Sequence, residues 1–217
     1  MNLPPVRRLA AVCAVAFLCA ACSGGRSAAR LAAPTDNPAA RPQTLLVLGG
    51  ADNEGQAIPD RLQDAWPYLL YHDAFPRAAV LVNDALDTAT AADVLDTQAS
   101  LVRQLSPDIV AMWIGIDDLR DRTPIPTFTH ELRTLTATLH ADGARHILIA
   151  DIPYAYGSNA AAYDVAIRTV AQAAGAVLVE LQHLHVTFVT DHRSPPEADA
   201  ATHRAIANAF EQALHRP

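Results

Sequence analysis

The sequence predicts an α/β fold in which a parallel sheet of five strands has helices on both faces. Three observations lead to this prediction. Five short apolar runs follow one another along the chain, most of them are continuous rather than alternating, and segments with helical periodicity lie between them. Continuous apolar runs are typical of parallel strands buried on both faces, and repeated strand–helix alternation indicates a three-layer α/β/α arrangement.

The expected elements can be placed in order along the chain. The strands are expected at 44–48, 78–82, 108–114, 146–150 and 176–180. A first helix is expected around Trp66 and Tyr71, and helical patterns follow at 90–105, 126–144, 161–176 and 198–215. In such sheets ligands bind beyond the carboxyl ends of the strands, so the informative residues should lie just after each strand.

The first 21 residues are expected to be a targeting signal rather than part of the fold. Arg7 and Arg8 precede an apolar run, 9–21, that is too short to span a membrane and suits a secretory signal core. The run ends at Cys22 and resembles a bacterial lipoprotein signal, in which cleavage before the cysteine exposes it for lipidation. Leu18 stands four residues before Cys22, whereas three is usual in such signals. Plain secretion, with cleavage after an Ala-x-Ala-like stretch, is the alternative.

These signals predict the organisation and location of the protein. We expect a signal peptide at 1–21, a lipid attachment site and flexible spacer at 22–43, and one domain at 44–217. The protein would lie in a bacterial cell envelope, anchored by lipid on the extracytoplasmic side of a membrane. In the alternative it is a soluble secreted or periplasmic protein.

Composition excludes several functional classes. The net charge of −7 argues against a nucleic-acid partner, and removal of 1–21 leaves 14 arginines against 23 acids, a charge of −9. The chain has no lysine, which excludes Schiff-base chemistry and a phosphate-loop lysine. Its cysteines are Cys13, Cys19 and Cys22, so the mature domain can form neither an internal disulfide nor a cysteine metal site. No cofactor is indicated.

Four short blocks stand where the strand ends are expected. They are Gly49 to Gly55, Asn83 to Thr90, Gly115 to Asp118, and the stretch that leads into the last helix. In order and spacing the blocks resemble those of the SGNH, or GDSL, hydrolases, over about residues 44 to 214. The resemblance implies a three-layer α/β/α fold with the flavodoxin-like strand order 2-1-3-4-5. It also implies hydrolysis of esters of lipids, acylated sugars and similar substrates by a Ser-His-Asp mechanism.

The resemblance places the family's site residues on residues of different chemistry. The nucleophilic serine falls on Ala51, the oxyanion glycine and asparagine on Thr88 and Asp117, and the triad acid and histidine on Ser194 and Glu197. Ala51 has no nucleophile, and an ionised Asp117 offers acceptors where an oxyanion needs donors. We therefore expect a hydrolase fold without serine-esterase chemistry that binds an unknown small ligand or protein partner at the former active site. Ala51 should lie at the rim of a shallow cleft near the other positions.

The alternative is an active ester hydrolase that uses relocated or unorthodox residues. Asp191-His192 lies upstream of the last helix and is the most evident acid–histidine pair, and Ser158 follows the fourth strand. Against this alternative, no serine, cysteine or threonine stands in the turn after the first strand. Triads are defined by geometry rather than by sequence position, so the alternative stays open.

Acidic residues are expected to gather at the same rim. The candidates for a ligand-binding rim are Asp52, Asp87, Asp117 and Glu197. Grouped carboxylates favour a hard cation or a cationic ligand, and they can share a proton, which raises one pKa. Alternatively, such acids cap helices or face water. His183 and His185 lack an evident third ligand, so no metal site is predicted.

Overall fold

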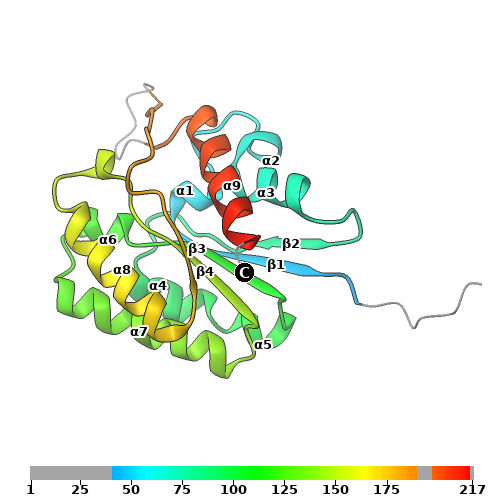
Figure 1. Ribbon diagram of the computed structural model, residues 1–217, viewed down its shortest axis with the longest axis horizontal. Helices are drawn as coiled ribbons and strands as arrows, with labels where there is room; N and C mark the ends of the chain where they lie inside the picture. The colour runs from blue at the N-terminus through cyan, green and yellow to red at the C-terminus, as the bar shows by residue number, and fades with distance from the viewer. Residues whose placement is uncertain (1–40, 190–196, 216–217) are drawn as a thin grey trace, which may run out of the picture. The chain divides into compact units, whose positions relative to one another are not determined.

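The sheet has the predicted five parallel strands in the predicted order. The computed structural model describes residues 41–189 and 197–215. Its parallel strands are ordered β2-β1-β3-β4-β5 (Figure 1). Their bounds are β1 (Thr44–Gly49), β2 (Val80–Asn83), β3 (Ile109–Trp113), β4 (His146–Ala150) and β5 (Val177–Val179). All five expected strands are present, and the flavodoxin-like order is confirmed.

The middle of the sheet is fully buried, as the continuous apolar runs predict. β1 pairs with β2 on one side and with β3 on the other, so that Leu45 lies between Leu81 and Ile109. Side chains of β1 from Leu45 to Leu48 have no exposed surface. β2 forms one edge and is more exposed, with Val80 at 42%. The parallel arrangement brings all carboxyl ends of the strands to one side of the molecule.

Helices cover both faces of the sheet (Figure 1). On one face α3 (Trp66–Ala74) packs against α9 (Ala200–Leu214), and the rings of Trp66 and Phe210 stack with centroids 4.2 Å apart. On the other face α7 (Ile125–Ala141) packs against α8 (Ala160–Ala174). The shorter elements are α1 (Ala51–Glu54), α2 (Arg61–Asp64), α4 (Ala91–Asp93), α5 (Leu101–Leu105), α6 (Ile116–Asp121) and the 3₁₀ helix η2 (Tyr154–Tyr156).

The helix expected over 90–105 is not continuous. Thr90 begins it with a capping box, in which its hydroxyl accepts from the backbone N–H of Asp93. After α4 the chain forms a π-helical segment, η1 (Val94–Gln98), before α5 begins at Leu101. A π-helical turn inserts an extra residue into the helix, and such turns are frequent at functional sites. Here the segment ends at Gln98, whose side chain is buried and turns toward the sheet.

Several expectations fall outside the part of the chain that the structure describes. These are the signal peptide at 1–21, the lipid attachment at Cys22, most of the spacer, the triad position Ser194 and the pair Asp191-His192. Within residues 41–189 and 197–215, no helix is long and apolar enough to cross a membrane.

Candidate functional site

The turn after β1 is held by hydrogen bonds to β2 and β3. Gly50 is the N-cap of the short helix α1, which ends at Gly55 in the left-handed conformation, φ 72°. The Asn53 amide donates to the carbonyl oxygen of Trp113 at the end of β3, at 2.7 Å. The amide of Asn83, the last residue of β2, donates to the carbonyl oxygen of Asn53 at 2.9 Å. These bonds fix the turn to both neighbouring strands.

Gln98 holds the last residue of β1 from the η1 side. Its Oε1 accepts from the backbone N–H of Gly49 at 2.9 Å, and its Nε2 donates to the Gly49 carbonyl at 3.1 Å. Gln98 is completely buried, so both backbone groups of Gly49 find their partners away from water. No pattern in the sequence distinguishes this glutamine from an ordinary helix residue, and the sequence analysis missed it.

Ala51 and Thr88, which the resemblance places at the family's serine and oxyanion glycine, differ in burial. Ala51 has 1% of its surface exposed and does not line the hollow at the site, so it is not at an open rim. Its methyl group faces the interior because α1 begins directly at this residue. Thr88 is exposed and has φ 59°, in the left-handed region that favours glycine. The backbone turn of a glycine is therefore kept by a β-branched residue.

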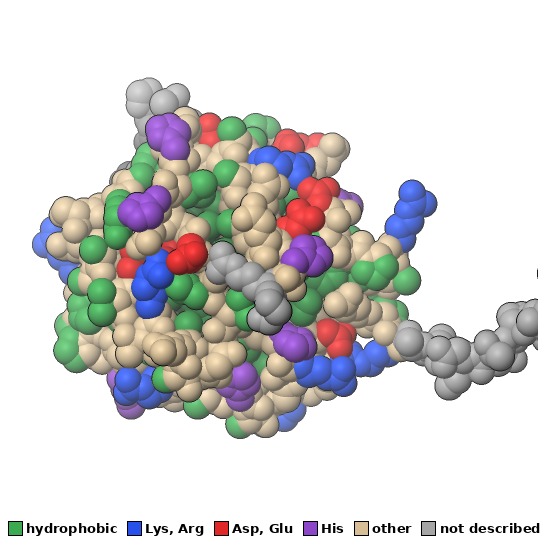
Figure 2. Space-filling view, viewed as in Figure 1, with side chains coloured by type: hydrophobic (Ala, Val, Ile, Leu, Met, Phe, Trp, Pro, Cys, Tyr) green, Lys and Arg blue, Asp and Glu red, His purple; other side chains and the backbone are tan. Residues whose placement is uncertain are grey.

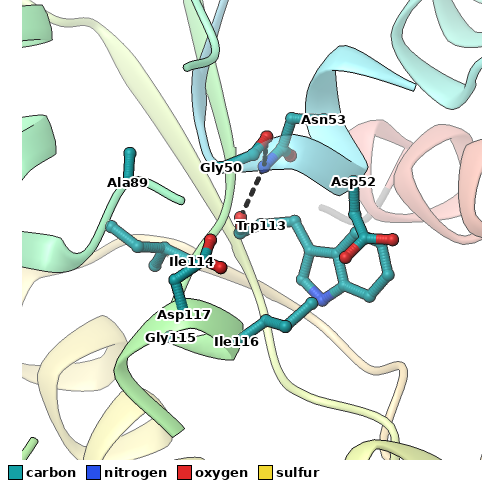
Figure 3. Close-up of a pocket in the computed structure, with 9 residues that line it drawn as sticks. All are labelled: Gly50, Asp52, Asn53, Ala89, Trp113, Ile114, Gly115, Ile116 and Asp117. Carbon is teal, nitrogen blue, oxygen red and sulfur yellow. Dashed lines mark hydrogen bonds between the residues drawn. The ribbon is translucent and has the colours of Figure 1, made fainter. Parts of the chain in front are cut away.

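Asp117 occupies the hollow beyond β1 and β3. The hollow is lined by Gly50, Asp52, Asn53, Ala89, Trp113, Ile114, Gly115, Ile116 and Asp117, and it is too small to admit a water molecule (Figure 3). A Cβ on Gly50 would lie 2.1 Å from Oδ2 of Asp117, which shows how closely this carboxylate approaches the turn. Burial raises the pKa of Asp117, while the nearby Arg120 guanidinium opposes that rise.

Asp52 lies on the other side of the site and is also buried, at 3% exposure. Its Oδ1 accepts from the hydroxyl of Tyr156 at 3.1 Å and from the backbone N–H of Ala198 at 3.3 Å. Burial raises the pKa of Asp52 to about 6, although Arg120 and the two hydrogen bonds act in the opposite direction. Asp52 therefore links α1 to the segment that precedes α9.

Arg120 connects the two acids. Its Nη1 donates to Oδ1 of Asp117 at 3.0 Å, and its Nη2 lies 3.8 Å from Oδ2 of Asp52. The guanidinium supplies an internal cation beside acids that could, from the sequence, bind a cation, share a proton, cap helices or face water. Arg120 was not among the predicted site residues, although its i,i+3 spacing from Asp117 on a short helix was a usable signal.

Glu197, the residue at the family's histidine position, accepts a backbone hydrogen bond. Its Oε2 receives the N–H of Ala57 at 2.8 Å, and only 7% of the residue is exposed. Beside it, the N–H of Val189 donates to the Glu197 carbonyl, and Phe188 forms an antiparallel bridge with Ala198. The structure thus places Glu197 next to the turn after β1, where its carboxylate holds backbone.

The remaining acids fit the role of loop supports. Oδ2 of Asp118 accepts from the N–H of Ala91 at 2.9 Å, and burial raises the pKa of Asp118 to about 6. Asp87 is exposed and lies close enough to Asp117 to raise its pKa. Of the four predicted rim acids, three are buried and Asp87 alone faces solvent. Among the described residues no group of three or more histidine, cysteine or acidic side chains is arranged to hold a metal ion.

The sheet order, with a site beyond the carboxyl ends of the strands, defines a flavodoxin-like α/β protein. The chain belongs to the GDSL-like Lipase/Acylhydrolase family, whose model matches residues 54–215. The match begins after Ala51 and includes Thr88, Asp117 and Glu197. No curated protein matches the chain.

Solved structures of esterases share the fold. The esterase EstA from Pseudoalteromonas sp. is 18% identical, with 79% of this chain and 96% of that chain covered and a TM-score of 0.65. A catalytic mutant of Axe2, an acetylxylan esterase from Geobacillus stearothermophilus, is 18% identical over 81% and 95%, with a TM-score of 0.65. LAE5, an alpha/beta hydrolase enzyme from the metagenome of Lake Arreo, is 23% identical over 79% and 94%, with a TM-score of 0.59.

Proposed function

We propose that this protein is a non-catalytic member of its family that binds a ligand or partner at the rim of the former active site. The observation that carries the proposal is the position of Asp117. Its carboxylate lies against Gly50, in a hollow too small for a water molecule. A developing oxyanion there would meet a carboxyl group in place of a hydrogen-bond donor.

The missing groups remove the acyl-transfer mechanism rather than weaken it. Loss of a single oxyanion donor costs a factor of about 10² to 10³ in turnover. Here Ala51 also lacks a nucleophile, and the carboxylate of Glu197 is occupied by the backbone of Ala57. A general base without a hydroxyl to activate contributes nothing to this chemistry.

An assay on p-nitrophenyl acetate, combined with labelling by a serine-directed fluorophosphonate, tests the loss of activity. We expect neither hydrolysis above a buffer blank nor labelling. Ala51→Ser should remain inactive, because Asp117 still fills the hollow and Glu197 still stands in the histidine position. The matched positive variant restores all five family residues together: Ala51→Ser, Thr88→Gly, Asp117→Asn, Ser194→Asp and Glu197→His. Robust hydrolysis by the unmodified protein would favour the relocated-site alternative and refute the proposal.

The charge of the rim supports a partner with positive charge. The segments beyond the carboxyl ends of the strands are 50–60, 84–90, 114–124, 151–159, 180–189 and 197–199, and together they contain 12 acids and two arginines. Five of the acids are buried, namely Asp52, Asp117, Asp118, Asp151 and Glu197, and the other seven have exposed surface. A fluorescent arginine-rich peptide is a suitable probe. We expect Asp87→Asn with Asp121→Asn to weaken its binding several-fold, since both acids are exposed and both act on Asp117. Asp96→Asn with Glu211→Gln, which removes the same charge elsewhere, should leave binding unchanged. If both pairs of substitutions weaken peptide binding equally, the peptide is attracted to the net charge of the protein and not to the rim.

We further propose that the mature protein is anchored by lipid through Cys22 on the extracytoplasmic side of a bacterial membrane. The support is the position of this cysteine, which follows a finished apolar run and precedes a flexible spacer. Native protein should partition into detergent, and Cys22→Ala should abolish that partition while Cys19→Ala preserves it. A soluble native protein whose N-terminus lies elsewhere would contradict the proposal.

A further inference from the structure

The end of the molecule at which the strands begin differs in charge from the rest of the domain. The segments that lead into the strands are 41–43, 75–79, 106–108, 142–145 and 175–176. They carry Arg41, Arg77 and Arg145 against Asp108 and Asp142. The opposite end carries seven acids with exposed surface, and five buried ones, against two arginines. A domain of strongly negative net charge therefore has a basic end and an acidic end along the direction of its strands.

Two arginines at the basic end are fixed by one carboxylate. Oδ1 of Asp108 accepts from Nη2 of Arg41 at 2.9 Å and from Nη1 of Arg145 at 3.2 Å. Oδ2 of Asp108 accepts from the backbone N–H of Thr44 at 2.9 Å, which ties the carboxylate to the start of β1. The side chain of Asp108 is 18% exposed, whereas those of Arg41 and Arg145 are 43% and 64% exposed. One carboxylate between two guanidinium groups leaves a positive charge that faces solvent.

These groups surround an open hollow of about 300 Å³, lined by Arg41, Gln43, Asp108, Ile109, Arg145 and His146. Arginine and histidine side chains gather at this end in the space-filling view, beside the start of β1 (Figure 2). Guanidinium groups bind phosphate oxygens through paired N–H donors, and two of them side by side match a phosphate better than a single flexible cation does. We call Arg41, Arg145 and His146 the arginine pole.

We propose that the arginine pole binds the phosphate groups of anionic phospholipids. Arg41 is joined to Cys22 by the 18 residues 23–40, and these 19 steps along the chain span at most about 65 Å when fully extended. A lipid at Cys22 would therefore keep the pole within reach of the membrane surface. An anionic surface attracts the pole and repels the acidic rim, so the rim would face away from the membrane, toward soluble partners. This orientation rests on the proposed anchor, whereas the phosphate site itself does not.

Site-specific fluorescence on the full protein, reconstituted in vesicles, tests the proposal. A dye at Gln104→Cys, an exposed position on α5, reports on the pole, and a dye at Leu86→Cys, 46% exposed beyond β2, reports on the rim. Nitroxide-labelled headgroups should quench the first dye much more than the second in vesicles of phosphatidylglycerol and phosphatidylcholine, but not in phosphatidylcholine alone. Arg41→Gln with Arg145→Gln should lower the preference for vesicles that contain phosphatidylglycerol about five-fold per arginine. Arg61→Gln with Arg204→Gln, which removes the same charge elsewhere, should preserve it.

The outcomes separate the pole from the anchor. The cysteines of the parent chain all lie in residues 13–22. If the dye labels the parent chain, Cys22 is free and the proposed anchor is wrong. Equal quenching of both dyes, or equal effects of the two arginine pairs, would overturn the arginine pole as a lipid site. Release of the pole by inorganic phosphate beyond the effect of sulfate at the same ionic strength would assign the site to free phosphate and overturn the lipid assignment.

Discussion

At the scale of single residues, the exchange of an amide for a carboxyl group at position 117 has the largest effect on the site. An asparagine side chain has N–H donors, whereas an ionised aspartate has acceptors only. In this protein the carboxylate approaches Gly50 and pairs with Arg120, which satisfies it without any ligand. Under the proposed function, the position of the oxyanion donor is thus filled by a carboxylate that Arg120 neutralises.

Thr88 offers a test of backbone strain at the same site. A left-handed backbone costs a residue with a Cβ roughly 1 to 2 kcal/mol, and glycine avoids that cost. Glycine also gains entropy in the unfolded chain, which offsets about 0.5 to 1 kcal/mol. We therefore expect Thr88→Gly to raise the free energy of unfolding by roughly 0.5 to 1 kcal/mol in urea titrations. Thr134→Gly, in the middle of α7, should lower it by roughly 0.3 to 0.5 kcal/mol, since threonine is itself a weak helix former. A loss of stability in both variants would show that Thr88 makes contacts worth more than its strain.

At the scale of elements, the turn after β1 depends on helices and strands that are distant in sequence. The π-helical turn η1 brings Gln98 to Gly49, and β2 brings Asn83 to Asn53. On the other side, the carboxylates of Asp52 and Glu197 bond backbone groups at Ala198 and Ala57. The acids expected to bind a ligand thus join the turn to the segment before α9.

Gln98→Ala tests the contribution of η1. The substitution removes the partner of the buried N–H of Gly49, while the Gly49 carbonyl still accepts from the N–H of Leu86 at 2.9 Å. A buried group left unsatisfied typically costs about 1 to 3 kcal/mol. We expect a clear fall in the midpoint of thermal unfolding. Gln104→Ala, at an exposed position on α5, is the matched control and should change stability by less than about 0.5 kcal/mol. An unchanged midpoint for Gln98→Ala would mean that water replaces the side chain at Gly49.

At the scale of the whole molecule, buried ionisable groups make stability depend on pH in opposite directions. Burial raises the pKa of Asp52, Asp118 and Asp164 to about 6, so between their ordinary 3.8 and 6 the folded state binds more protons than the unfolded state. The contribution of these acids to the free energy of unfolding therefore becomes less favourable as pH rises through this window. His203 does the reverse, because burial lowers its pKa from 6.5 to about 4. Its neutral form accepts a hydrogen bond from the N–H of Trp66, and its contribution is lost as pH falls below 6.5.

The variant His203→Asn isolates the effect of His203 on the pH dependence of stability. The asparagine oxygen can accept the same N–H bond but does not titrate. Relative to this variant, the protein should lose on the order of 2 kcal/mol of its stability advantage between pH 7 and pH 5, since the unfolded histidine gains a proton over that range and the folded one does not. Urea unfolding at both pH values measures the difference. A gap that stays constant with pH would show that His203 is protonated to the same extent in both states.

The sequence predicted the sheet more completely than the site, for physical reasons. The strands were found because a buried parallel strand must be apolar along its whole length, as residues 44–48 are. The strand order came from the family resemblance. Burial of Asp52 and Asp117 was not foreseen, because a strand-end acid looks the same in sequence whether it faces water or an arginine. The buried position of Ala51 and the role of Gln98 depend on packing between distant segments, which leaves no periodic signal.

The central place of β1 also has a mechanical consequence. The anchor would pull on this strand at Arg41, and a partner at the rim would pull in the opposite direction. Because β1 is paired along its length with both β2 and β3, a load along this axis must shear two rows of hydrogen bonds at the same time. A pull between Arg41 and Arg77, which both lie where strands begin, would instead open β1 and β2 one bond after another. If the protein is anchored at Cys22 and bound by a partner at the rim, the domain would thus resist force along the line between membrane and partner and yield more easily across it.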